Sequence, residues 1–292
     1  MPRPTRFHSA EQAAPRHRRI RRRAAAALVA LLLLLLLGPR PTPAAPPSRP
    51  QEIEAAAVVL LDVRTGKVLY ARDPHRRLPP ASTTKMMTAI LAAEALPLDA
   101  LVPISLRASR ERGGSAIGLN PGEWWTVDDL LHAMLIHSAN DAAVALAEAV
   151  SGSVEAFAVR MNARARLLGA RDTHFVTPNG RYDPQHFSSA YDLALIARTA
   201  LANPVVARIV SLRTWTLLRP HADPRLLINT NRLLWRLQGA DGVKTGWVAE
   251  SGPCLVASAT RQHRRLIAVL LDAPRVFSDA ARLLEFGFTG SP

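Results

Sequence analysis

Cysteine and lysine are scarce in this 292-residue sequence, and each shortage limits what the chain can be. Cys254 is the only cysteine, so no disulfide can form within the chain. It stands in the apolar run "SGPCLVASA", which predicts a core position rather than a nucleophile. Among 37 lysine and arginine residues, only Lys67, Lys85 and Lys244 are lysines. A buried lysine can lose its proton whereas an arginine stays charged, so these three positions indicate where a basic amine could act.

The net charge of +14 is concentrated at the N-terminus. Residues 1–50 hold ten arginines and one glutamate, whereas the rest of the chain has 27 basic and 22 acidic residues. A nucleic-acid-binding domain carries its excess charge on its folded surface. We therefore expect no nucleic-acid partner.

The first residues have the pattern of an export signal. The basic run Arg16–Arg23 precedes 14 apolar residues, Ala24–Leu37, which is shorter than the ~20 residues that span a bilayer. Thr42-Pro43-Ala44 offers a small-x-small cleavage site. We expect residues 1–45 to be a signal peptide or an N-terminal anchor and 46–52 a Pro/Ala linker. The folded part, 53–289, is then extracytoplasmic, in the periplasm or secreted, and is attached to a membrane only if the N-terminal segment stays uncleaved.

Strands are predicted at both ends of the folded part, with helices between them. Two β-prone runs flank Thr65-Gly66, which indicates a hairpin, and Lys67 after that turn is expected to be a solvated cation. Helical spacing begins near Ser82 and returns over 125–205. The other predicted elements are three strands and a closing helix, at 239–250, 252–261, 264–273 and 276–288.

These elements predict an α/β fold of the α+β type. Its antiparallel sheet is built from N- and C-terminal segments and flanked by helices, and a helical lobe is inserted between the two groups of strands. We expect no second domain after residue 288.

Ser82 and Lys85 are separated by one helical turn in "STTK". Residues i and i+3 share a helix face, so a desolvated neutral lysine there can activate the serine hydroxyl as a nucleophile. The helix N-terminus also places a backbone N–H where an oxyanion could form. On its own, S-x-x-K is a weak signal.

Two further motifs are chemically suggestive. Ser138-Ala139-Asn140, inside a helical stretch, could project a hydroxyl and an amide into a cleft, although the triplet alone is more typical of a turn or a local cap. Lys244-Thr245-Gly246 lies on an apparent edge strand. There the glycine would admit a substrate backbone, while the lysine and threonine offer a charge and a hydroxyl to a carboxylate.

In this order, "STTK", "SAN" and "KTG" resemble the three motifs of the penicillin-binding protein and serine β-lactamase superfamily. The segments "GGSAIGLNPGEWWTVDDLLHAMLIHSANDAAVALAE", "MNARARLLGARDTHFVTPNG", "DGVKTGW" and "LLEFGF" are similar to the low-molecular-mass D-alanyl-D-alanine carboxypeptidases. The resemblance covers about 53–289 and implies a β-lactamase/transpeptidase-like fold. It also implies that 53–289 is the catalytic domain of a penicillin-binding D,D-peptidase.

The resemblance implies a role for each motif residue. Ser82 would attack the carbonyl between two D-alanines of a peptidoglycan stem peptide and form an acyl-enzyme, with Lys85 taking its proton. Ser138 would relay a proton toward the leaving D-alanine. Asn140 would hold Lys85 and the substrate amide.

The third motif would bind the substrate. Lys244 would supply positive potential near Ser138, and Thr245 would help to seat the terminal carboxylate. Gly246 would let the substrate backbone approach, and the backbone N–H groups of Ser82 and Trp247 would form the oxyanion hole. Water would then release the product, no cofactor or metal is implied, and β-lactam antibiotics would act as covalent inhibitors.

The sequence departs from the family in two respects. Trp247 follows K-T-G where His or Thr is common, which changes the rim of the cleft rather than the backbone donor. Many relatives continue into a β-rich domain and an amphipathic membrane helix, and the sequence stops at Pro292. Single-domain relatives include endopeptidases that cut peptidoglycan crosslinks, so a D,D-endopeptidase stays an alternative.

Three other functions fit less well. The commonest β-lactamases use a glutamate between the second and third motifs to activate water, and no glutamate lies between Glu155 and Glu250. A zinc peptidase needs clustered ligands, whereas the nine histidines are scattered, and His132 and His137 are interpreted as a helix-surface or core pair. An inactive wall-binding module would not need the complete motifs.

Overall fold

The computed structural model describes residues 53–219 and 222–290. The predicted signal peptide or anchor (1–45) and the predicted linker (46–52) lie outside these residues. Within the described ranges, no single helix combines the length and the apolar composition needed to cross a membrane.

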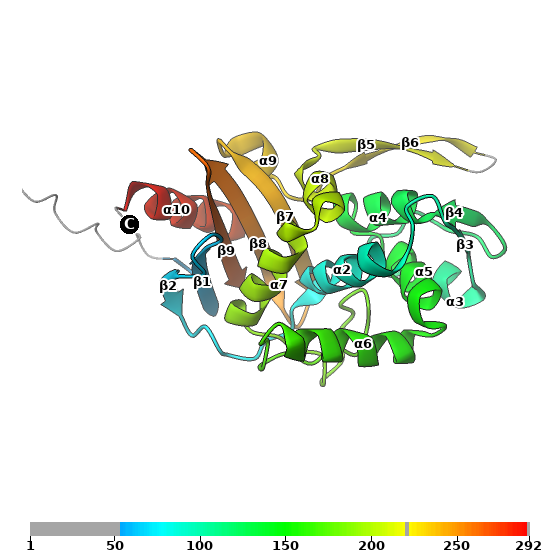
Figure 1. Cartoon of the computed structure of the whole chain (residues 1–292), viewed down its shortest axis with the longest axis horizontal. Coiled ribbons are helices and arrows are strands. Elements are labelled where there is room, and N and C mark those ends of the chain that lie inside the picture. The colour runs from blue at the N-terminus through cyan, green and yellow to red at the C-terminus, as the bar shows by residue number, and fades with distance from the viewer. Residues whose placement is uncertain (1–52, 220–221, 291–292) are drawn as a thin grey trace, which may run out of the picture. The chain divides into compact units, whose positions relative to one another are not determined.

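A five-stranded antiparallel sheet joins the two ends of the folded part (Figure 1). Its order is β2 (Val68–Arg72), β1 (Ala57–Asp62), β9 (Arg264–Leu271), β8 (Gly252–Arg261) and β7 (Ala240–Val248). β1 and β2 form the predicted N-terminal hairpin, and exposed Lys67 follows its turn as expected. β1 also pairs with β9, with Leu60 opposite Ala268. The predicted sheet from N- and C-terminal segments is therefore confirmed.

Each face of the sheet is covered by helices, which lie on opposite sides of it in Figure 1. Successive strand residues point to opposite faces, so Val58 and Leu60 pack with α10 (Val276–Thr289). Val59 and Leu61 belong to the larger core on the other face, which α7 (Ala190–Ala202) covers.

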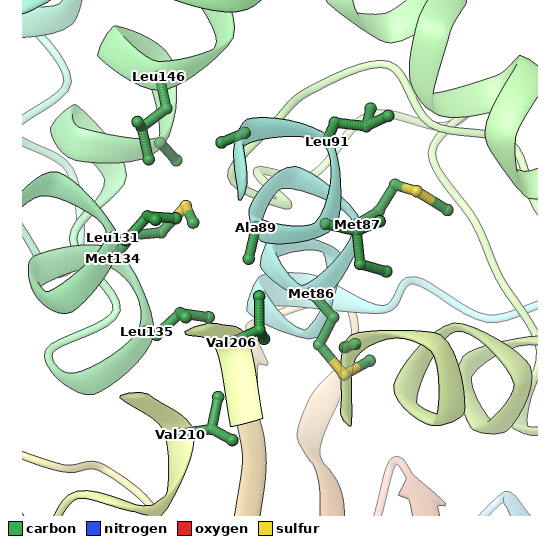
Figure 2. Close-up of a cluster of buried hydrophobic side chains, with 14 of the residues drawn as sticks. Met86, Met87, Ala89, Leu91, Leu131, Met134, Leu135, Leu146, Val206 and Val210 are labelled. Atoms are coloured by element: carbon green, nitrogen blue, oxygen red, sulfur yellow. The ribbon is translucent and has the colours of Figure 1, made fainter. Parts of the chain in front are cut away.

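The helical lobe is built around α2 (Lys85–Ala95), whose first eight residues are all buried. Figure 2 shows Met86, Met87, Ala89 and Leu91 of α2 in an apolar cluster with residues of three other helices. The predicted helices of 125–205 are confirmed. They and the neighbouring helices are α3 (Leu106–Ser109), α4 (Val127–Ile136), α5 (Asn140–Ser151), α6 (Val154–Leu167), α7, α8 (Pro204–Ser211) and α9 (Leu233–Arg236).

The structure differs from the sequence-based prediction at two places. Ser138-Ala139-Asn140 does not lie inside one helix, because α4 ends at Ile136 and α5 begins at Asn140. Ser138 between them has a φ of 66°, a left-handed conformation that a helix interior does not allow. The small sheets β3–β4 (Leu101–Pro103, Trp124–Thr126) and β5–β6 (Thr214–Arg219, Ala222–Ile228) were not predicted.

Candidate active site

Ser82 and Lys85 lie where a short 3₁₀ helix, η1 (Ala81–Thr84), runs into α2. Lys85 Nζ is 2.8 Å from Ser82 Oγ, so the one-turn spacing brings amine and hydroxyl together as predicted. The same nitrogen donates to Asn140 Oδ1 and to the Asn179 carbonyl oxygen, both at 2.7 Å. All three partners of Lys85 are oxygen atoms of uncharged groups.

Lys85 is fully buried, and this burial lowers the pKa of its amine well below the ordinary lysine value. The charge of Lys244 acts in the same direction, while Asp141 and Glu111 oppose it from a distance. Removing an ammonium from water costs free energy that an ion pair could offset, and the contacts of Lys85 supply only neutral acceptors. The site therefore favours a neutral amine beside the serine.

The second motif faces the third across the cleft. Lys244 Nζ donates to Ser138 Oγ at 3.0 Å and to the carbonyl of Thr245 at 3.1 Å. Lys244 is 1% exposed, and burial lowers its pKa to about 7. The resemblance implies positive potential here, and a group with this pKa carries it in the protonated fraction that is present near neutral pH.

Asn140 connects Lys85 to the opposite wall of the site. Its Nδ2 donates to the carbonyl of Gly113 at 2.7 Å, and its backbone N–H donates to the carbonyl of Ser115 at 2.8 Å. The neighbouring Asp141 carboxylate accepts from the backbone N–H groups of residues 117–119. The start of α5 thereby fixes the chain that forms this wall.

Edge strand β7 passes directly beside Ser82. A Cβ atom on Gly246 would lie 3.1 Å from the backbone nitrogen of Ser82 and 3.0 Å from the Pro80 carbonyl oxygen. A side chain at this position would be a tight fit, because its Cβ atom would press on the backbone of residues 80–82. Thr245 Oγ1 lies 2.6 Å from Thr230 Oγ1, and Trp247 is 67% exposed on the rim.

A cleft of about 1000 Å³ opens over these groups. Its lining includes Ser82, Ser138, Asn140, Thr245, Gly246 and Trp247, so residues of all three motifs share one cavity. Arg181, Arg232 and Arg236 also line the cleft, and Arg181 is paired with Glu111 at 3.0 Å, while none of the described lining residues is acidic. Such a cleft is suited to a peptide that carries a carboxylate.

Sequence reasoning missed the turn that contains Asn179 and Gly180. The Asn179 carbonyl accepts from Lys85, and a Cβ atom on Gly180 would lie 1.9 Å from the Ala81 carbonyl oxygen. Gly180 also has a φ of 79°, which favours glycine. The only available signal was "TPNG", which has the composition of a tight turn.

The remaining candidate groups lie outside the catalytic contacts. Cys254 is buried, as predicted, and burial raises the pKa of its thiol to about 11. His132 is fully buried and stacks on Trp215 with ring centroids 3.8 Å apart, while half-buried His137 lies 3.1 Å from an Arg225 nitrogen. Over 53–219 and 222–290, no group of three or more His, Cys, Asp or Glu side chains could hold a metal ion.

Residues 42–275 match the sequence profile of the peptidase S11 family, D-alanyl-D-alanine carboxypeptidase. The chain belongs to this family. It is 41% identical over 244 residues to D-alanyl-D-alanine carboxypeptidase DacF of Bacillus subtilis, an alignment that covers 81% of this chain and 62% of DacF. The chain thus spans less than two thirds of the length of that relative.

Two further similarities bear on the S11 assignment. A D-alanyl-D-alanine endopeptidase of Pseudomonas aeruginosa is 34% identical over 86% of this chain and 82% of its own length. The crystal structure of penicillin binding protein 6B from Escherichia coli superposes with a TM-score of 0.77 at 34% identity, over 83% of this chain and 80% of the other. The superposition confirms the penicillin-binding fold that the sequence resemblance implied.

Proposed function

We propose that residues 53–289 are the catalytic domain of a serine-type D-alanyl-D-alanine carboxypeptidase that removes the terminal D-alanine from peptidoglycan stem peptides. The observation that carries this proposal is the hydrogen bond between Lys85 Nζ and Ser82 Oγ at 2.8 Å in a buried site. Membership of the S11 family supports the same activity.

Acylation begins with proton transfer from Ser82 to Lys85. A neutral amine has two N–H bonds, and Asn140 Oδ1 and the Asn179 carbonyl provide an acceptor for each. The lone pair then faces Ser82 Oγ and accepts its proton while the oxygen attacks the substrate carbonyl. The backbone N–H groups of Ser82 and Trp247 stabilise the resulting oxyanion.

Collapse of the tetrahedral intermediate breaks the bond to the terminal D-alanine. The leaving nitrogen takes the proton of the Ser138 hydroxyl, and the Lys244 ammonium, 3.0 Å away, replaces it. The proton that Lys85 took from Ser82 restores the Lys244 ammonium, so acylation leaves both lysines in their starting states. Thr245 and the positive potential of Lys244 seat the terminal carboxylate. A water molecule then attacks the ester on Ser82 and regenerates the enzyme.

A β-lactam mimics the scissile amide, so we expect it to acylate Ser82 as a covalent inhibitor. The name of the similar E. coli protein, penicillin binding protein 6B, supports this expectation. The arginines of the cleft favour a substrate with a free C-terminal carboxylate, which a carboxypeptidase binds. We infer that the enzyme acts outside the cytoplasm, where peptidoglycan is exposed.

An endopeptidase that cuts D-alanyl crosslinks is the second candidate, and the similarity to the P. aeruginosa endopeptidase favours it. Purified crosslinked and uncrosslinked muropeptides distinguish the two. We expect release of free D-alanine from uncrosslinked pentapeptides to be faster than cleavage of crosslinked dimers. The reverse order would identify an endopeptidase, and cleavage of neither substrate would refute the proposed activity.

A further inference from the structure

His186 connects the segment that carries Ser82 and Lys85 to the turn that carries Asn179. It is 2% exposed and does not line the cleft. Both nitrogen atoms of its ring have partners. Nε2 lies 2.9 Å from Thr84 Oγ1, while Nδ1 lies 3.0 Å from the backbone nitrogen of Val176 and 3.2 Å from that of Thr177.

These contacts determine the protonation state of the ring. The two backbone N–H groups can only donate, so Nδ1 must carry a lone pair. The hydrogen is then on Nε2, which donates to the Thr84 hydroxyl. A protonated ring would direct a second N–H against two backbone donors, so this arrangement is specific to neutral histidine.

The charges around His186 leave the neutral form favoured. Burial lowers the pKa of His186 to about 4. Asp183, from the same loop, opposes this effect, whereas His174 and Lys85 add to it. The ring is therefore neutral well above pH 4.

The turn at residues 176–179 is fixed to η1 and α2 at three positions, one of them through the His186 ring. Thr84 is held through His186, Lys85 donates to the Asn179 carbonyl at 2.7 Å, and Thr88 Oγ1 donates to the Pro178 carbonyl at 2.6 Å. Loss of His186 would leave the Val176 and Thr177 N–H groups without their acceptor in a partly buried place. The Asn179 carbonyl, two residues farther along, would then be held less firmly against Lys85.

We propose that His186 is a positioning residue of the active site, whose neutral Nε2–H form holds residues 176–179 so that the Asn179 carbonyl orients Lys85 toward Ser82. This inference rests on the proposed function, because it takes Lys85 as the proton acceptor. Since His186 does not line the cleft, its loss slows the acylation step and leaves ligand binding nearly unchanged.

Two substitutions separate the roles of the two ring nitrogens. His186→Asn keeps an acceptor near the position of Nδ1 but does not reach Thr84, whereas His186→Gln keeps a donor toward Thr84 and loses that acceptor. His174→Gln is the matched control, because His174 lies in the same loop and its Nδ1 contacts only the Gln185 carbonyl. Each protein is first shown to be folded by circular dichroism and thermal unfolding.

Acylation is then followed with a fluorescent penicillin over a concentration series that separates the dissociation constant from the acylation rate constant. We expect the rate constant of both His186 variants to fall about tenfold or more, with a change of less than about threefold in the dissociation constant. His174→Gln should match the wild type. Folded His186 variants that acylate as fast as the wild type would overturn the inference.

Thr84 provides a second and independent test. Thr84→Ser keeps the acceptor hydroxyl and should retain most of the rate, whereas Thr84→Val should slow acylation about as much as His186→Asn. If Thr84 and His186 act through one hydrogen bond, the variant that combines Thr84→Val with His186→Asn will acylate no more slowly than the slower of the two single variants. Rate losses that multiply would refute the inference.

The two hypotheses fail differently. A wild-type protein that no penicillin acylates at Ser82 would refute the proposed function, and this inference with it. Normal acylation of the wild type together with fast His186 variants would refute the positioning role alone. If the His186 variants do not fold, a Thr84→Val variant with the wild-type rate constant refutes the role, and a slowed one supports it.

Discussion

Lys85 Nζ and Ser82 Oγ are 2.8 Å apart, and the other two partners of the amine are the oxygen atoms of Asn140 and Asn179. No carboxylate is among these partners. Because burial also lowers the pKa of Lys85, the amine has the character of a base rather than of a fixed cation. This relationship gives rise to the first two predictions.

Ser82 should be the residue that a β-lactam modifies. Its hydroxyl is adjacent to the candidate base, and it lines the cleft. Intact-mass measurement after penicillin treatment, followed by peptide mapping, should place one adduct on the Ser82 peptide, and Ser82→Ala should show none. An adduct on another residue would contradict the assignment of the nucleophile.

The two buried lysines should respond differently to arginine. Lys85→Arg removes the proton acceptor, because a guanidinium stays charged, and should slow acylation on the order of a thousandfold or more. Lys244→Arg keeps a charged donor for Ser138 and should lose less, although a larger side chain must fit a position that is 1% exposed. The acylation rates of folded Lys85→Arg and Lys244→Arg, measured with the same penicillin, test this difference. Equal rates would exclude Lys85 as the base.

Gly180→Ala should disrupt the site far more than Gly152→Ala does. Both glycines have a φ near 80°, but a Cβ atom on Gly180 would lie 1.9 Å from the Ala81 carbonyl oxygen, whereas nothing lies within 4 Å at Gly152. Gly152→Ala is therefore the control: it should lower the free energy of unfolding only by the backbone strain of a positive φ, about 1–2 kcal/mol. Thermal unfolding and penicillin acylation of both variants test this, and similar losses at the two positions would contradict the close packing.

Stability should decline in mild acid partly because of His186. Its pKa falls from 6.5 to about 4 on folding, so only the unfolded state takes up this proton between those values. The free energy of unfolding therefore keeps its full value from this group above pH 6.5. It falls by about 3 kcal/mol in total as the pH drops to 4.

Urea unfolding at pH 7 and pH 4.5 measures this effect. The free energy of unfolding of the wild type should fall more steeply between the two pH values than that of His186→Gln, which lacks the titrating group. The carboxylates that titrate in the same range are common to both proteins and cancel in the comparison. Equal slopes would show that His186 does not carry this pH dependence.

Sequence patterns predicted the sheet because each of its strands has a signal of its own. The β-prone runs around Thr65-Gly66 and the three C-terminal runs became β1, β2, β7, β8 and β9. The break at Ser138 had only a weak signal, because Ser-x-Asn is typical of a turn or a local cap while helical spacing continues from α4 through "HSAN" into α5. The structure shows the break in the positive φ of Ser138. The β5–β6 hairpin was missed because Pro224 interrupts the pattern of its second strand.

The sequence could identify those residues of the candidate site that act through their side chains. Ser82, Lys85, Ser138 and Lys244 were assigned through the resemblance that the three ordered motifs carry, because each motif alone is a weak signal. The structure places Lys85 against Ser82 and Lys244 against Ser138. The Asn179 carbonyl could not be found in this way, because every residue type has such an oxygen. Its position depends on a turn that is distant in sequence from α2.

The pairing of β1 with β9 has a consequence for the order of folding. Leu60 in β1 is synthesised early, but it can pair with Ala268 in β9 only after most of the chain has been made. Such pairing raises the contact order, which slows folding and leaves the apolar edge of the first hairpin open until the last strands arrive. The sheet therefore cannot be completed from the N-terminal hairpin alone and needs β9 in place.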